Sequence, residues 1–385
     1  MRPKLKTAAL LCAVTLSTQA FSQADPINVV TSATPFLRIS PDARSGGMGD
    51  MGVATSPDAN SSFWNIAKTP FAKSKSAVSL TYTPWLKDLG VNDVFLASLA
   101  GYYQLDDQSA VSASMRYFNL GSIQFTDFSG RDISTGKPTE ISFDLGYSRK
   151  VSDKVALGVA LRYINSNLTR GYAASNGVTY KAGSAIAGDL SLYYDNTKET
   201  GAGFRAGIAL SNLGSKISYT NDAQQKDYIP ANLGIGFTYT SAFDESNKIS
   251  FGIEANKLMV PTPPLATGDS ATDANALSSY RGKGIVNSWF SSFGDAGSFK
   301  DELAEYQVGL GAEYSYNDQF FVRAGYFYED KTKGNRKFFT AGVGIVYNVF
   351  GLNFSYLIPS GNGVNRNPLS NTLRFSLVFN FDGDK

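Results

Sequence analysis

Two features of the residue content limit the chemistry that this chain could carry out. The sequence has no histidine, which excludes Ser-His-Asp and Cys-His catalysis, imidazole bases and His-ligated zinc. Asp269, Asp273 and Asp295 offer carboxylates, but they lack the Asp-x-Asp-x-Asp spacing and closing glutamate of a calcium loop. We therefore expect no enzyme activity, no metal centre and no cofactor.

A glycine-rich run at residues 45–52 raises the question of a phosphate-binding loop. Its glycines do not follow the GxGxxG spacing, and no lysine of the Walker type comes after them. Glycine also lets two backbones approach closely in a confined space, which favours a plug inside a lumen. The residues that we assign to such a plug are Arg44, Met48, Asp50, Met51, Asn60 and Asn65.

Charged residues of both signs recur on segments whose opposite faces are apolar. At the middle of a bilayer, a charge facing lipid costs about 2–4 kcal/mol, so these side chains should point into a lumen. We predict a polar network around the plug rather than an open pore. Its members are Arg116, Asp144, Arg162, Asp189, Arg205, Glu254, Glu313, Arg323 and Arg374.

Aromatic residues in the longer connections form a third group that could bind something. Aromatic side chains away from lipid are enriched in protein interfaces, because they bury a large area at low entropic cost. Packing back over the mouth of a barrel is the alternative role, and the sequence leaves both open. The group comprises Phe125, Phe128, Tyr172, Tyr219, Tyr228, Trp289, Phe290 and Phe293.

The elements that must position these residues are strands. About fourteen segments of roughly ten residues alternate apolar and polar side chains, which is the period of a strand with one apolar face. This length suits a tilted strand that crosses a bilayer. The predicted strands are 76–86, 93–103, 109–119, 139–149, 154–165, 184–194, 202–211, 231–240, 247–256, 304–315, 319–328, 337–347, 350–358 and 371–381.

The lengths of the connections support an antiparallel transmembrane β-barrel. Every second connection is short, and most of those between are long, with the longest at 257–303. Outer-membrane barrels have tight periplasmic turns and longer outer loops. An even number of strands with this pattern predicts periplasmic termini and extracellular long loops. The net charge of +2 gives no reason to expect nucleic acid as a partner.

The residues before the first strand fall into two parts. Residues 1–22 combine basic residues, an apolar run and a small-residue cleavage site, which predicts a secretory signal peptide. The sole cysteine, Cys12, lies within it. Residues 23–75 are then an N-terminal periplasmic plug or hatch, and residues 76–385 form the barrel with its long outer loop.

Two motifs in the plug resemble a known family. Ala43-Arg44-Ser45-Gly46-Gly47-Met48-Gly49-Asp50-Met51-Gly52 and Asn65-Ile66-Ala67 are similar to the N-terminal hatch of FadL-type outer-membrane proteins, a family of fourteen-stranded barrels. Within that family, Asn60-Ser61-Ser62-Phe63-Trp64-Asn65, Thr83-Pro84-Trp85-Leu86 and Ala324-Gly325-Tyr326-Phe327-Tyr328-Glu329 resemble the PorV (LptO) proteins of type IX secretion.

The resemblance implies an outer-membrane component of the type IX secretion system. Such a protein receives secreted cargo that bears a C-terminal signal domain at a large outer-membrane translocon. It then delivers that cargo to a cell-surface attachment complex with a sortase-like protein. Outer-membrane lipid or lipopolysaccharide is a further expected partner. The alternative function is a FadL-type channel for hydrophobic small molecules, which would need a continuous apolar pocket.

Overall fold

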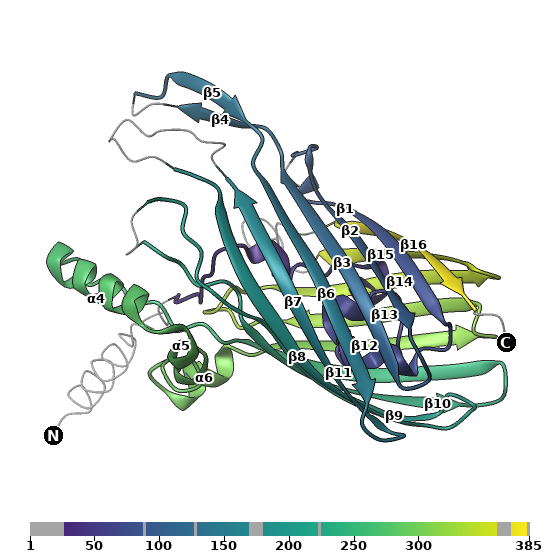
Figure 1. Cartoon of the computed structure of the whole chain (residues 1–385). Coiled ribbons are helices and arrows are strands. Elements are labelled where there is room, and N and C mark those ends of the chain that lie inside the picture. Colours follow the sequence, from purple (N-terminus) through teal and green to yellow (C-terminus); the bar gives the residue numbers. More distant parts are fainter. Residues whose placement is uncertain are drawn as a thin grey trace, which may run out of the picture.

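A computed structural model describes residues 27–87, 90–126, 129–168, 180–221, 225–359 and 371–382. Fourteen antiparallel strands close into one barrel, in which β1 pairs with both β2 and β16 (Figure 1). Closure gives every spanning strand two hydrogen-bonded neighbours, as a membrane interior requires. The prediction of a fourteen-stranded barrel is confirmed.

The barrel strands lie within a few residues of the predicted segments. They are β1 (Ser76–Pro84), β2 (Val94–Gln104), β3 (Ser109–Leu120), β6 (Thr139–Lys150), β7 (Val155–Asn167), β8 (Gly183–Thr197), β9 (Gly203–Gly214), β10 (Asn232–Ala242), β11 (Asn247–Leu258), β12 (Gln307–Tyr316), β13 (Phe320–Tyr328), β14 (Lys337–Tyr347), β15 (Phe350–Pro359) and β16 (Leu373–Phe381).

The connections sort by length to the two ends of the barrel. Short turns, such as 317–319 between β12 and β13, lie at one end with the start of β1 and the end of β16. We call this the short-turn end and the opposite one the long-connection end. The latter carries elements that the alternation pattern did not predict. They are a hairpin of β4 (Ile123–Thr126) and β5 (Asp132–Gly136), and the helices α4 (Ser270–Gly282), α5 (Ile285–Ser291) and α6 (Phe299–Ala304).

Alternation along the strands separates an apolar outer face from a polar lumen. Leu145, Leu161 and Ile186 point outward, with 70%, 71% and 66% of their surfaces exposed. Asp144 and Arg162, each next to one of them in sequence, are buried on the inner face. No helix among the described residues is long and apolar enough to cross a membrane.

The N-terminal segment runs through the lumen before the chain enters β1. Its short helices lie against strands from different parts of the wall: α2 against β14 to β16, α3 against β2 and β3, and η2 against β6 and β7. Figure 1 shows this segment in purple within the barrel. The four helices are η1 (Pro35–Arg38), α2 (Ala43–Gly46), α3 (Ser61–Trp64) and η2 (Ile66–Phe71). We call residues 27–75 the plug.

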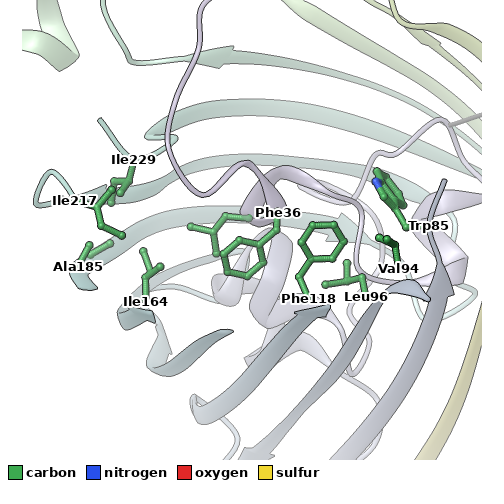
Figure 2. Close-up of a cluster of buried hydrophobic side chains, with 11 residues drawn as sticks. Phe36, Trp85, Val94, Leu96, Phe118, Ile164, Ala185, Ile217 and Ile229 are labelled. Atoms are coloured by element: carbon green, nitrogen blue, oxygen red, sulfur yellow. The ribbon is translucent and has the colours of Figure 1, made fainter. Parts of the chain in front are cut away.

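Apolar side chains of the plug and wall form a buried cluster near the long-connection end of the lumen. Phe36 of η1 is fully buried and its ring stacks on Phe118 of β3 at 6.3 Å. Trp85 meets Phe118 edge-on, and Ile164 and Ile217 extend the cluster across β7 and the β9–β10 connection (Figure 2). Burial of these large side chains stabilises the plug by the hydrophobic effect.

Glycines on both partners allow the plug backbone to touch the wall. A Cβ atom at Gly325 of β13 would lie 2.1 Å from the backbone nitrogen of Gly49 and 2.3 Å from the carbonyl carbon of Met48. Gly49 itself has a positive φ of 69°, which disfavours other residues. The glycine-rich run therefore makes a close backbone contact with the barrel wall.

The start of the plug lies at the opposite end of the barrel from the end of β16. The amide of Asn28 donates to the carbonyl of Thr332 at 3.1 Å, and its side chain donates to the carbonyl of Pro263 at 3.2 Å. Both acceptors lie in connections at the long-connection end, Thr332 between β13 and β14 and Pro263 between β11 and β12, whereas Phe381 lies at the short-turn end. Residue 28 and Phe381 therefore lie at opposite ends of the barrel, because the plug traverses the lumen.

Replacement of Gly325 by alanine is expected to destabilise the plug–wall contact. The added methyl group overpacks a backbone contact, at a cost of about 1–3 kcal/mol. The free energy of unfolding in detergent, followed with denaturant, measures the loss. Gly284→Ala is the control, because a Cβ atom there meets nothing within 4 Å. Equal midpoints for the two variants would contradict the contact.

Candidate functional site

A buried carboxylate joins the plug to the barrel wall. Glu313 of β12 receives hydrogen bonds from Arg44 Nε and Nη2 of α2, at 3.0 and 2.8 Å, and from Arg323 Nε of β13 at 2.6 Å. Arg44 also pairs with Asp58 of the plug at 3.0 Å. Both hydrogen bonds of the Arg44 fork meet one carboxylate, which is a strong, geometrically specific pairing.

A second ion-pair group lies on the neighbouring strands β6 to β9. Arg162 pairs with Asp144 and, through Nη2, with Asp189 at 2.9 Å. It also donates to the side chain of Asn212, whose backbone amide donates to Asp189 at 2.8 Å. A buried guanidinium has lost its hydration, and the two carboxylates supply the opposite charge and the hydrogen-bond acceptors that compensate for this loss.

Other predicted lumen residues serve the plug backbone directly. Arg116 donates to the carbonyl of Leu37 and lies over the ring of Phe63, 4.7 Å from its centroid. Glu254 accepts hydrogen bonds from the amides of Gly52 and Val53, at 2.8 and 2.7 Å. These amides belong to an irregular turn of the plug, so the wall supplies acceptors that the turn lacks.

The last two members of the set are Arg374, which contacts the plug, and Arg205, which contacts neighbouring wall strands. Arg374 of β16 is buried, and its Nη2 lies 3.3 Å from the carboxylate of Asp50 in the plug. Arg205 pairs with Asp195 at 3.2 Å and donates to the hydroxyl of Thr240 at 3.1 Å. The nine residues assigned to the lumen network are thus engaged with the plug or with neighbouring wall strands.

The remaining predicted plug residues act through packing and capping. Met48 and Met51 are buried, and a Cβ atom at Gly252 would come within 2.1 Å of Met51 Cε. Asn65 accepts from the amide of Ala67 and so caps η2, while its Nδ2 donates to the carbonyl of Leu192 in β8 at 2.9 Å. The side chain of Asn60 is buried before α3.

Two buried ionisable residues of the plug escaped the sequence analysis. Asp42 caps α2 by accepting from the amide of Ser45, and it accepts from the indole of Trp64 at 2.8 Å. Burial raises the pKa of Asp42, with repulsion from Asp58 adding to this effect. The available signal was the Asp-x-x-Ser spacing before a short helix.

Lys68 of η2 is fully buried and donates to two neutral acceptors. Its Nζ lies 2.8 Å from the carbonyl of Gly52 and 3.0 Å from the hydroxyl of Thr55. Burial lowers the pKa of Lys68 to about 8, although the negative charge of Asp58 opposes this shift. Nothing in the local sequence distinguishes this lysine from a solvated one.

A cavity of about 430 Å³ remains between the plug and the short-turn end. Charged side chains of both signs contribute to its lining, including Arg44, Asp58 and Arg205 with Lys248 and Asp318. The two lysines Lys73 and Lys248 both pair with Asp318. This lining differs from the continuous apolar pocket that a channel for hydrophobic molecules needs.

The aromatic residues of the connections divide into buried and exposed groups. Tyr228 is 5% exposed and donates to the carbonyl of Tyr280 at 2.9 Å, and Tyr219 donates to the hydroxyl of Ser166 at 3.0 Å. Both contribute to packing at the mouth, which is the alternative role that the sequence left open. Phe290 and Phe293 are exposed, and Trp289 is half-buried.

The other two assignments concern the hairpin and the β7–β8 connection. Phe125 lies half-buried in β4, where its ring approaches Gly136 of β5. Phe128 and Tyr172 lie outside the described residues.

Sequence comparison identifies the family of this fourteen-stranded, plugged barrel. Residues 21–265 match the family described as type IX secretion system protein PorV, which covers the plug and the barrel strands through β11. The chain belongs to the PorV family. Family and fold together make it an outer-membrane component of type IX secretion, a transport system. No curated protein matches the chain in sequence.

Solved structures similar in fold to this chain include FadL-type barrels. The toluene transporter TbuX of Ralstonia pickettii aligns with a TM-score of 0.52 at 14% identity, over 88% of this chain and 98% of that chain. The toluene transporter TodX of Pseudomonas putida gives 0.50 at 12%, over 89% and 99%. A Pseudomonas aeruginosa FadL homologue gives 0.50 at 12%, over 92% and 99%. At these identities the likeness concerns the fold alone.

The substitution Glu313→Gln is expected to destabilise the plugged barrel by about 3–5 kcal/mol, because it leaves two buried arginines without their shared charge. Denaturant unfolding of the purified protein measures this loss. Glu199→Gln is the matched control, since Glu199 is exposed at the short-turn end. A loss no greater than that of the control would contradict the prediction. It would mean that the other partners, Asp58 for Arg44 and Asn353, to which Arg323 Nη1 donates at 2.8 Å, compensate fully.

Stability should rise with pH because of Lys68. The unfolded amine keeps its proton up to about pH 10.4, whereas the folded pKa is about 8. Between these values the unfolded state binds more protons, so the free energy of unfolding increases with pH. Unfolding of the wild type and of Lys68→Met between about pH 7 and pH 10 tests this. A constant difference between the two proteins over that range would refute the assignment.

Proposed function

We propose that this PorV-family barrel binds secreted cargo at its long-connection end and delivers it to a cell-surface attachment complex. The cargo would carry a C-terminal signal domain and arrive from a large outer-membrane translocon, and the receiving complex would include a sortase-like protein. The long connections would face the cell exterior and the short turns the periplasm.

The observation that carries this proposal is a contrast between the lumen and the rim. Ion pairs such as Arg44–Glu313 and the apolar cluster around Phe36 fix the plug inside the wall. Helix α4, in contrast, has no buried residue and extends away from the barrel (Figure 1). A surface function therefore accounts for more of this architecture than passage through the lumen does.

Helix α4 has properties of a docking element. Its C-terminal end is fastened to the rim, because Lys216 Nζ donates to the carbonyls of Arg281 and Lys283, and Arg281 pairs with Asp227 at 3.2 Å. The preceding turns carry small residues and the 40%-exposed Leu277. An isolated helix of this length is marginally stable in water, so contact with a partner would stabilise it.

The second candidate is a FadL-type channel for hydrophobic molecules. The fold shared with TbuX and TodX favours it, whereas the charged lining of the 430 Å³ cavity does not. Purification from the native outer membrane separates the two functions. Co-purifying secreted proteins with a common C-terminal domain support the shuttle, and bound apolar small molecules on an otherwise isolated barrel support the channel.

Replacement of residues 270–279 by a Gly/Ser linker of equal length should abolish docking without opening the barrel. We expect recovery of secreted cargo to fall at least about tenfold, equivalent to about 1.4 kcal/mol of binding free energy. Quantitative co-purification measures it, and retained heat-modifiable electrophoretic mobility shows an intact barrel. The same replacement of residues 123–136 is the comparison. Loss of cargo only with the second variant would move the docking surface to the β4–β5 hairpin.

A further inference from the structure

The side chain of Lys257 lies on the outer wall of the barrel. Its neighbours Glu254 and Asn256 face the lumen, where Glu254 binds the plug amides and Asn256 accepts from Arg38 at 3.2 Å. Glu254 and Asn256 occupy alternate positions, and Lys257 is the next residue after Asn256 in β11. Alternation along the strand therefore turns Lys257 outward.

Helix α6 and residues next to it, together with Phe293 after α5, cover this outward lysine. The side chain of Lys257 is fully buried, and its Nζ lies 2.8 Å from Glu302 Oε1 and 2.5 Å from Glu305 Oε2. Lys333, in the β13–β14 connection, pairs with Glu305 at 2.9 Å. Oxygens of the Asp295, Glu302 and Glu305 carboxylates lie within 4.8 Å of one another, and the two lysines pair with Glu302 and Glu305 of this acidic group. The α5–α6 segment is thereby held against the outer wall.

The wall beside this segment has the character of a membrane–water interface. Tyr328 lies at the long-connection end of β13. Its neighbour in the strand, Phe327, is buried on the inner face, so Tyr328 points outward. Lys337, paired with Tyr328 in the sheet, lies over its ring at 4.9 Å. Tyrosine and lysine at outward positions near strand ends mark the interfacial belt of membrane proteins.

Apolar side chains of α5 and α6 remain exposed beside this belt. Phe290 and Phe299 are 71% and 79% exposed, and Val286 and Leu303 are more than half exposed. Phe293 is exposed too, and its ring centroid lies 5.6 Å from Lys257 Nζ. The exposed group thus continues the apolar outer face of the barrel across the rim.

We propose that α5 and α6 insert these side chains into the acyl-chain region of the outer leaflet, as an interfacial anchor. Helices of seven and six residues are unstable alone in water, and neither buries a large apolar side chain. Short segments rich in Phe, Trp and Leu bind at membrane interfaces. Continuity with the lipid-facing wall selects lipid as the occupant. The anchor would fix the base of the connection from which α4 projects.

Depth measurement in a bilayer tests the anchor. Nitroxide labels are placed on single cysteines, Phe290→Cys and Phe299→Cys, in a full-length chain in which Cys12 is changed to serine. The labelled proteins are reconstituted in phosphatidylcholine/phosphatidylglycerol vesicles. The ratio of collisions with oxygen to collisions with a water-soluble nickel chelate then reports depth. Leu310→Cys on the outer wall is the lipid reference, and Ser278→Cys on α4 is the water reference.

An anchor predicts a ratio at both positions several-fold above that of Ser278→Cys and close to that of Leu310→Cys. Values equal to those of Ser278→Cys would overturn the proposal. Water-like values in vesicles combined with immobilised labels in native outer membrane would overturn it as well, and would assign the patch to a protein partner. Heat-modifiable mobility confirms barrel closure, and Val286→Cys and Leu303→Cys replace any variant that fails to close. These outcomes do not depend on cargo recovery, so they leave the α4 proposal separately testable.

Discussion

The structure depends on one constraint, which is that hydrocarbon outside the wall tolerates apolar side chains and rejects charges. Because side chains alternate along a strand, every second one points inward, and charges such as Asp144, Arg162 and Glu313 occupy these positions. Within the lumen these charges cannot remain unpaired. Glu313 meets this requirement by binding Arg44 of the plug together with Arg323 of the wall. The same pairings that satisfy the wall therefore fix the plug.

Close backbone contact is the second requirement of a filled lumen. Gly325 in β13 and Gly49 in the plug permit an approach that a Cβ atom on Gly325 would block at 2.1 Å. Larger side chains fill the lumen elsewhere, as Phe36 and Phe118 do near the long-connection end. This packing of the lumen supports the proposal that transport partners bind the projecting connections.

The strands and the connections differ in how well their structure could be predicted from sequence patterns. Alternation and composition were sufficient to predict the barrel strands, the inward direction of Arg162 and the position of Arg44 in the plug. Alternation and composition are properties of residues that are neighbours in the sequence. Tyr228 was assigned to a docking surface, but it is buried by contacts with Tyr280 and Lys283. Aromatic content alone does not distinguish a residue that packs from one that binds.

The sequence by itself determined the all-β class, the strand number and the sorting of charges, since a period of two is a local property of the chain. Only the tertiary structure decided which charges pair: Arg44 and Glu313 are 269 positions apart in the sequence. It also decided that Asn28 reaches the long-connection end and that Lys68 is buried. These outcomes depend on the path of the plug through a closed lumen, and barrel closure brings together residues that no local pattern relates.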